Sequence, residues 1–260
     1  MINISEGRDR TIIDAVAAAA GDDLLDVHSD PFHHRSVLTV VGEKAARAVA
    51  TEAVARIDLR SHLGAHPRIG ALDVVPFVAL EGSTFDDALR ARDQFCRWAS
   101  DELRLPCFAY GPERSLPAIR RGAFEDLEPT TGPGEPHPSA GAVAVGAREL
   151  MVAYNVWLRD PDLDQARSVA SAIRGPRLRA LGLEVGDRVQ VSMNLIAPLR
   201  LGPAEATDAV AAHAAIAGCE LVGLVPEVVL GAVPTGRWEA LDLSTDRTIE
   251  ARLRRRLGAD

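Results

Sequence analysis

Hydrophobic and polar positions follow the same order of periods in the two halves of the chain. In the first half, apolar spacing predicts a strand at 2–4, a helix at 12–20, strands at 24–27 and 36–41, a helix at 45–57 and a strand at 72–80. In the second half, it predicts a strand at 150–157, a helix at 162–173, strands at 178–185 and 188–195, a helix at 203–217 and a strand at 220–225. The first strands also match, since Ile2-Asn3-Ile4 corresponds to Tyr154-Asn155-Val156. The chain is therefore expected to contain one βαββαβ unit twice.

The segment between these repeats adds further elements. Thr84 and Asp87 have the spacing of a capping box for a helix at 84–103, and a strand is expected at 106–110. Residues 111–142 are rich in proline and glycine, which predicts a linker or functional loop with one helical turn at 116–121. We also expect a loop at 28–34 and a basic, solvated surface helix at 248–257.

These elements predict an α/β (α+β) fold. Two similar ferredoxin-like subdomains, 1–145 and 146–260, are expected to carry helices packed on mixed sheets. A groove between two such subdomains is the usual place for a ligand.

Composition narrows the class of partner. The 260 residues include 37 acidic and 29 basic side chains, a net charge of -8, which argues against nucleic acid or an anionic membrane as partner. Three widely spaced cysteines, and a start without a signal peptide, predict a reduced cytoplasmic protein. Adjacent histidines, His33 and His34, rarely supply a full metal shell, so no metal is expected.

The segment 60–73 concentrates ionisable residues on a glycine- and proline-containing loop just before an apolar strand. His66 lies between Gly64 and Pro67, with Arg68 and Asp73 following. An imidazole titrates near neutral pH and can take and return a proton, while Arg68 could bind a carboxylate. The alternative is a structural loop histidine that bonds to the backbone. Spacing by itself leaves both interpretations open.

Motifs along nearly the whole chain resemble the formiminotransferase family. They are Ile2-Asn-Ile-Ser-Glu-Gly7, Leu25-Asp-Val27, Arg35-Ser-Val37, Ile57-Asp-Leu59, His62-x-Gly-x-His-Pro-Arg-x-Gly-Ala-x-Asp-Val-x-Pro-Phe77, Ser115-Leu-Pro117, Val145-Gly-Ala-Arg148, Tyr154-Asn-Val156, Gln190-Val-Ser-Met-Asn-Leu195 and Glu220-Leu-Val-Gly-Leu-Val-Pro226. The resemblance covers the transferase half of a bifunctional folate enzyme, and no cyclodeaminase half is expected.

The resemblance implies a homodimeric enzyme of one-carbon metabolism and histidine degradation. Such an enzyme moves a formimidoyl group between N-formimidoyl-L-glutamate and N5 of tetrahydrofolate, a co-substrate. The expected partners are small molecules, namely folate and a formimidoylated amino acid or amine. The residue before Pro-Arg, His66, corresponds to the family's catalytic histidine, and the resemblance implies catalytic roles for Arg68 and His28 too. The implied binding residues are Asn3, Glu6, Arg35, Asp73, Arg148, Asn155, Ser192 and Asn194.

Several positions depart from the family pattern close to the chemistry. His28 replaces an aspartate that can support the catalytic histidine, and other changes occur at Ser61, Leu63, Ala65 and Trp157. Losing a carboxylate removes an acceptor that orients an imidazole. Two alternatives therefore stay open: transfer to or from a different amine in specialised metabolism, and a non-catalytic folate-binding protein.

Overall fold

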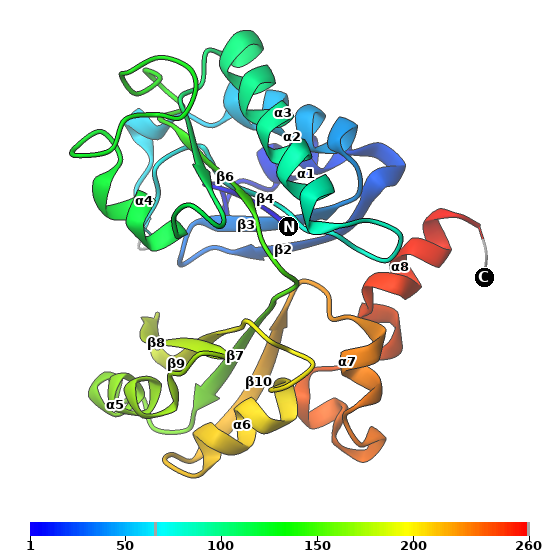
Figure 1. Cartoon of the computed structure of the whole chain (residues 1–260). Coiled ribbons are helices and arrows are strands. Elements are labelled where there is room, and N and C mark those ends of the chain that lie inside the picture. The colour runs from blue at the N-terminus through cyan, green and yellow to red at the C-terminus, as the bar shows by residue number, and fades with distance from the viewer. Residues whose placement is uncertain (65–66, 259–260) are drawn as a thin grey trace. The chain divides into compact units, whose positions relative to one another are not determined.

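The computed structural model describes residues 1–64 and 67–258. They form two compact units, Met1–Glu149 and Leu150–Asp260, each with its own sheet (Figure 1). His66 and Ala65 lie outside the described residues.

The first unit is built on a six-stranded mixed sheet of order β2-β3-β1-β4-β6-β5. Its strands are β1 (Ile2–Ile4), β2 (Leu24–Asp30), β3 (Arg35–Val40), β4 (Leu72–Phe77), β5 (Cys107–Tyr110) and β6 (Val143–Ala147). Its helices are α1 (Arg10–Ala18), α2 (Glu43–Arg56), α3 (Phe85–Leu103) and α4 (Leu116–Gly122).

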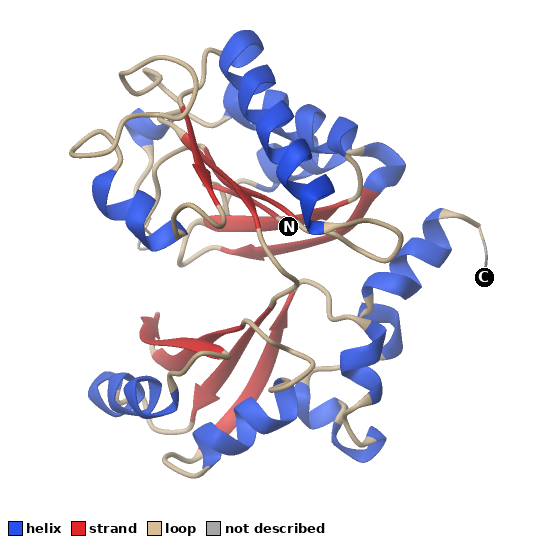
Figure 2. Ribbon diagram, in the orientation of Figure 1, coloured by secondary structure: helices blue, strands red, loops and turns tan. Residues whose placement is uncertain are grey.

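The second unit is built on a four-stranded antiparallel sheet of order β10-β7-β9-β8. Its strands are β7 (Val152–Leu158), β8 (Leu178–Val185), β9 (Arg188–Leu195) and β10 (Ile216–Val222). Its helices are α5 (Leu163–Ile173), α6 (Pro203–Ala211), α7 (Glu227–Gly231) and α8 (Ile249–Arg256), and Figure 2 shows the helices and strands of both units.

The two units share one topology. The run β1-α1-β2-β3-α2-β4 gives the strand order β2-β3-β1-β4, and the run β7-α5-β8-β9-α6-β10 gives the equivalent order β8-β9-β7-β10. The predicted α/β class and the repeated βαββαβ unit are therefore confirmed. In the first unit, β5 and β6 extend the sheet by parallel pairing after β4.

Each face of the first sheet has its own apolar cluster. Ile2, Ile4 and Leu38 pack with residues of α1, α2 and α3 on one face. Val74, Phe108 and Ile119 form a smaller cluster with α4 on the other face. Side chains alternate along a strand, so neighbouring residues of one strand serve opposite faces.

Helix starts follow local side-chain chemistry. The Thr84 and Asp87 capping box forms as predicted at the start of α3, where both reciprocal hydrogen bonds are present. Asp9 caps α1 by accepting from the backbone N–H of Thr11 and Ile12. The helix predicted at 162–173 begins one residue later, because Asp162 itself is the N-cap of α5.

Several predicted boundaries are wrong. His28 belongs to β2 and not to a loop, because β2 continues to Asp30 before the turn to β3. The helix predicted to reach residue 217 ends at Ala211, and β10 begins at Ile216. The strand predicted at 72–80 ends at Phe77. Strand β6 and helix α7 were not predicted.

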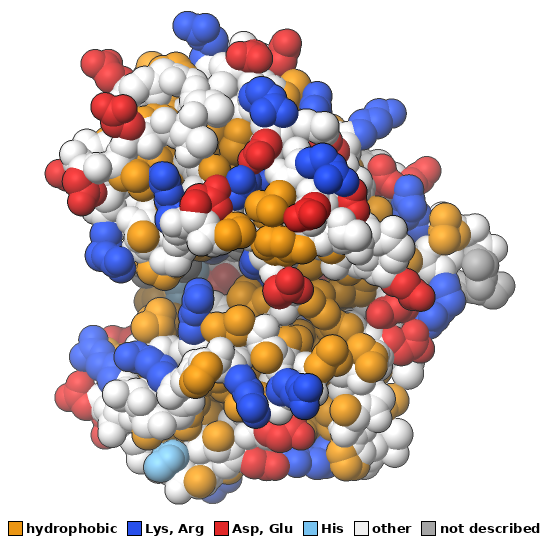
Figure 3. All heavy atoms as spheres, in the orientation of Figure 1, with side chains coloured by type: hydrophobic (Ala, Val, Ile, Leu, Met, Phe, Trp, Pro, Cys, Tyr) orange, Lys and Arg blue, Asp and Glu red, His pale blue; other side chains and the backbone are white. Residues whose placement is uncertain are grey.

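Two surface properties complete the description. Basic and acidic side chains are interspersed over the face drawn in Figure 3. Among the described residues, no helix combines the length and the apolar character that crossing a bilayer requires.

Candidate active site

Backbone pairing places two predicted site residues in one row across the first sheet. His28 pairs with Val37, Val37 pairs with Asn3, and Asn3 pairs with Val74. Paired residues point to the same side of a sheet, so His28 and Asn3 share the face that carries Val74 and α4. The strand of Val37 separates them by roughly 10 Å, given strand spacings of about 4.8 Å. His28 and Asn3 are therefore on one face without being strand neighbours.

A buried carboxylate organises the centre of this face. Asp73 is fully buried, and its Oδ2 atom lies 2.8 Å from Nη1 of Arg35 and 2.6 Å from Nη2 of Arg120. Its Oδ1 atom accepts the backbone N–H of Ile69 at 2.9 Å. Burial opposes ionisation of Asp73, but the two guanidinium groups outweigh it and hold the pKa below the ordinary value. The Asp73 carboxylate is therefore ionised, and both of its oxygens accept hydrogen bonds from other groups of the protein.

Arg35 links this carboxylate to the first strand. Its Nε atom donates to Oδ1 of Asn3 at 3.2 Å while Nη1 binds Asp73. Burial, and then the positive charge of Arg120, lower the pKa of Arg35 to about 10, against the opposing effect of Asp73. The structure thus brings together three of the predicted binding residues: Asn3, Arg35 and Asp73.

Arg68 follows residues 65–66 in the chain, and its side chain reaches back to the segment before them. Its Nη2 atom donates to the carbonyl oxygen of Gly64 at 2.8 Å, and its Nη1 atom contacts Nδ1 of His62. Burial lowers the pKa of Arg68, and Arg120 acts in the same direction. The side chain of Arg68 therefore ties the segment 62–64 to the segment that begins at Pro67.

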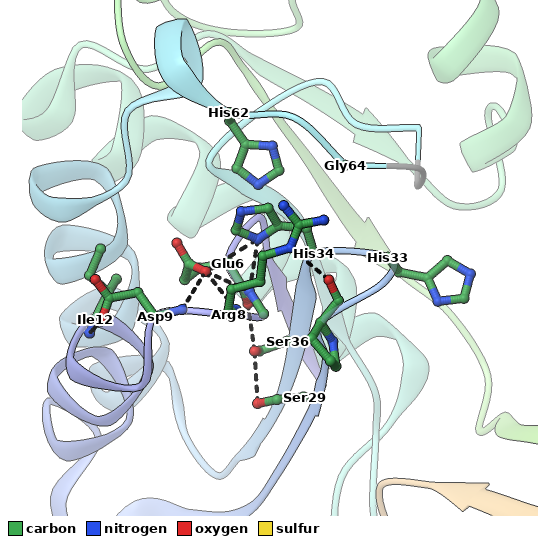
Figure 4. Close-up of polar contacts among 12 residues, drawn as sticks. Glu6, Arg8, Asp9, Ile12, Ser29, His33, His34, Ser36, His62 and Gly64 are labelled. Carbon is green, nitrogen blue, oxygen red and sulfur yellow. Dashed lines mark hydrogen bonds and ion pairs between the residues drawn. The ribbon is translucent and has the colours of Figure 1, made fainter. Parts of the chain in front are cut away.

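Glu6 lies at the start of the first helix. Its Oε1 atom accepts the backbone N–H groups of Gly7, Arg8 and Asp9 at 2.9, 2.7 and 3.0 Å (Figure 4). The same oxygen lies 3.2 Å from Nδ1 of His34. Consecutive N–H groups that converge on one carboxylate form an anion-binding nest, which fixes the turn between β1 and α1. These contacts give Glu6 a structural role within the site.

His34 and His62 form a pair of imidazoles beside Glu6. Their ring centroids are 4.0 Å apart with an interplanar angle of 32° (Figure 4). The segment 60–73 is called the histidine loop below. The turn before β3 lies tightly against it, because a Cβ atom added to Gly64 would be 2.8 Å from Cβ of His34. Only glycine fits at this contact.

The contact with Arg68 fixes the tautomer of His62. A guanidinium can only donate, so Nδ1 of His62 must accept from Arg68. The neutral ring of His62 then carries its proton on Nε2, which has no hydrogen-bond partner among the described residues. Nδ1 of His34 accepts the backbone N–H of Gly7 at 3.1 Å and also lies 3.2 Å from Oε1 of Glu6. Burial lowers the pKa of both histidines, and Arg68 adds to this effect at each. Both imidazoles are therefore held in the neutral form near pH 7.

Three contributors to this site escaped the sequence analysis. Arg8 donates to the carbonyls of Pro31 and Leu63, and Arg120 reaches Asp73 from α4. His34 was considered only as a metal ligand. Among the described residues, no group of three or more His, Cys, Asp or Glu side chains is placed to hold a metal ion. The closeness of the Ser115-Leu-Pro117 motif to Arg120 was the available signal for that residue.

Arg148 lies at the other end of the sheet from the Glu6 turn. It follows β6, and its Nη1 atom donates to the carbonyl oxygen of Glu149 at 3.0 Å. Burial lowers its pKa, while the hydroxyl of Tyr110 opposes this effect. The described contacts of Arg148 do not include Asp73 or Arg35, so it stays apart from the cluster above.

The second unit gathers its predicted residues on one sheet face. Glu220, Asn155 and Ser192 are paired in one row across β10, β7 and β9, and Nδ2 of Asn155 donates to Oε2 of Glu220 at 3.0 Å. Asn194 follows Ser192 on the same face and is exposed. This face is opposite the one packed by α5 and α6. It presents amide, hydroxyl and carboxylate groups together.

One departure from the family pattern lies on the same face. Trp157 is two residues from Asn155 in β7, and the guanidinium carbon of Arg188 lies 4.0 Å from the centroid of its ring. The stacked Arg188 guanidinium and Trp157 indole therefore lie next to the amide row, the paired residues Glu220, Asn155 and Ser192.

Comparisons with known proteins agree on one family. Residues 1–148 match the family model described as the formiminotransferase domain, N-terminal subdomain. The chain is 38% identical to a glutamate formimidoyltransferase of Streptococcus pyogenes serotype M1, over 75% of each chain. It is 36% identical to a glutamate formimidoyltransferase of Thermoplasma acidophilum, over 88% of each chain. It is 34% identical to the formimidoyltransferase-cyclodeaminase of Rattus norvegicus, over 86% of this chain and 49% of that protein.

Proposed function

This chain belongs to the formiminotransferase family and is a transferase of one-carbon groups, and we propose that it moves a formimidoyl group between N-formimidoyl-L-glutamate and N5 of tetrahydrofolate. The observation that carries the proposal is the match to two glutamate formimidoyltransferases over most of the chain, at 38% and 36% identity. Family membership also favours the enzyme over a non-catalytic folate-binding protein.

The reaction needs one group that can both accept and return a proton. The lone pair of N5 attacks the amidine carbon, and a tetrahedral intermediate forms with an excess proton on N5. A base removes that proton, and its conjugate acid delivers it to the glutamate nitrogen as the carbon–nitrogen bond breaks. In the proposal His66 performs both steps as general base and general acid.

The surroundings of His62 and His34 make these two residues poorly suited to the step. Nδ1 of His62 and Nδ1 of His34 are each occupied by a donor, and burial disfavours the charged form of both rings. A group that has to exist as a cation during the reaction cycle is poorly served by such surroundings. The proposal therefore keeps His66, the histidine before Pro67 and Arg68 that the family resemblance identifies, for proton transfer.

Each unit, taken by itself, carries groups that suit hydrogen bonds to a folate. The pterin edge offers N–H donors and a carbonyl acceptor, which suit the amide of Asn3 in the first unit. In the second unit the amides of Asn155 and Asn194 and the hydroxyl of Ser192 share one face. In the proposal these side chains are the candidates for hydrogen bonds to the folate, and His66 handles the proton.

A direct assay tests the proposal. Purified protein incubated with N-formimidoyl-L-glutamate and tetrahydrofolate should consume both and release glutamate in equal amount. Turnover with another formimidoylated amine, and none with the glutamate compound, would reject glutamate as the partner.

A different amine partner is the second candidate function. Leu63 is 82% exposed on the histidine loop, where the family has a charged residue, and Trp157 occupies a position next to the amide row. Both changes favour a less polar partner than glutamate. A panel of amines incubated with a formimidoylated donor and analysed by mass spectrometry separates the two candidates. The homodimeric state, the cytoplasmic location and a role in histidine degradation stay predictions.

A further inference from the structure

We propose that Arg120 is a positioning residue that holds the backbone directly after His66 and so sets the geometry of proton transfer. The inference rests on the proposed function, because it gives Arg120 a purpose only if His66 acts on the substrate. It assigns a role to helix α4, which the reaction scheme above does not use.

Helix α4 is fixed firmly enough to act as a support. Ser115 caps it by accepting the N–H of Ala118, and Pro117 is in its first turn. Ile119 is fully buried in the cluster with Val74 and Phe108, which attaches the helix to the sheet. The next residue along the helix is Arg120, so its side chain starts from a backbone position that packing determines.

The guanidinium of Arg120 joins two parts of the histidine loop. Its Nη1 atom donates to the carbonyl oxygen of Pro67, the residue that follows His66 in the chain. Its Nη2 atom donates to Oδ2 of Asp73 at 2.6 Å. The planar fork of arginine serves two acceptors at a fixed separation, which the single ammonium of lysine cannot reproduce.

Asp73 completes the attachment from the other side. Its Oδ1 atom accepts the N–H of Ile69 at 2.9 Å. A carbonyl before Arg68 and an N–H after it are thus both bound to the Arg120–Asp73 pair. The loop segment 67–69 is held at two backbone points, and Arg68 between them reaches Gly64 and His62. Arg120 therefore acts on the chemistry through the loop and not by touching the substrate.

Replacing Arg120 tests this role. In Arg120→Ala, kcat for formimidoyl transfer should fall about 10- to 100-fold, since a misplacement of about 1 Å costs rate on this scale. KM should change less than about threefold, because Arg35 keeps its contacts with the predicted binding residues Asn3 and Asp73. Arg120→Lys should lie between the wild type and Arg120→Ala, and millimolar guanidinium ion should partly restore the activity of Arg120→Ala.

Arg121 provides the matched control on the same helix. It is exposed, and Arg121→Ala removes the same charge without a described side-chain contact. Unchanged kcat in Arg121→Ala together with a loss in Arg120→Ala supports the role. Equal losses in the two variants, or full activity in Arg120→Ala, would overturn it.

A measurement independent of activity separates this inference from the proposed function. Amide hydrogen exchange at Ile69 should speed up in Arg120→Ala and Arg120→Lys, and not in Arg121→Ala. If the wild type transfers no formimidoyl group, the proposed function fails, and this exchange result still decides whether Arg120 holds the loop. Unchanged exchange at Ile69 in both Arg120 variants would reject the positioning role.

Discussion

Asp73 shares one carboxylate oxygen between two guanidinium groups, from Arg35 on β3 and Arg120 on α4. Replacing Asp73 with Asn would leave two cations partly buried without a counter-charge. The free energy of unfolding should fall by about 3 kcal/mol, near the usual cost of breaking a buried pair. Urea unfolding of Asp73→Asn measures this.

The exposed pair of Asp58 and Arg60 provides the comparison. Solvent screens such a pair, so Asp58→Asn should leave the free energy of unfolding nearly unchanged. Equal losses of unfolding free energy in Asp73→Asn and Asp58→Asn would show that burial does not determine how much Asp73 stabilises the fold.

His34 and His62 give the folded protein a pH dependence of definite sign. Burial lowers both pKa values below the ordinary 6.5, so the unfolded chain binds protons that the folded chain resists. Their contribution to stability is complete above pH 6.5 and is lost as the pH falls toward the lower folded pKa values. The midpoint of urea unfolding should therefore decrease between pH 7.5 and 5.5.

Substitution identifies the histidine responsible. His62→Gln keeps an acceptor for Arg68 but cannot take a proton, so the decrease between pH 7.5 and 5.5 should shrink. His213→Gln, at an exposed histidine of the second unit, should keep the wild-type decrease. A wild-type pH dependence in His62→Gln would contradict the assignment.

The residue types of the site were largely accessible from sequence, and their partners were not. Asn3, Arg35 and Asp73, which the family motifs predict to bind substrate or folate, lie together in the structure. The contact between Arg120 and Asp73 spans 47 positions of the chain. No spacing rule predicts such a contact, because it depends on the packing of α4 against the sheet.

At the scale of elements, the close packing of β5 and β6 is the most sensitive feature. A Cβ atom added to Gly146 would lie 2.0 Å from the Tyr110 ring. Gly146→Ala should therefore lower the free energy of unfolding by about 1–3 kcal/mol through overpacking. Gly134 has no atom within 4 Å of an added Cβ, so Gly134→Ala should change it by less than about 0.5 kcal/mol. Calorimetry of both variants measures the difference.

The same packing explains why β6 escaped prediction. The strand Val143–Ala147 is buried on both faces and follows a proline- and glycine-rich stretch, so it shows no alternation. The error at α6 has another cause. Alanines favour helix at 211–217, but the strand pairing of Ile216 with Leu158 prevails over that local preference. Capped helices such as α3, by contrast, carry their start signal locally.

At the scale of the molecule, each unit has its own apolar core. The cluster around Tyr154, Val191 and Leu221 consists only of residues from the second unit. A fragment of residues 150–260 should therefore fold by itself and give dispersed amide signals in NMR spectra with a cooperative thermal transition. Narrowly dispersed signals and a non-cooperative transition would show that its core depends on the first unit.

The central claim is that His66 moves the proton in formimidoyl transfer to tetrahydrofolate. The most direct test is the rate of glutamate release by His66→Ala and by the wild type, with N-formimidoyl-L-glutamate and tetrahydrofolate both saturating. The account predicts a fall of about 10²- to 10⁴-fold, the usual contribution of general acid–base catalysis, and an unchanged rate in the control His213→Ala. A rate in His66→Ala equal to that of the wild type would contradict the claim.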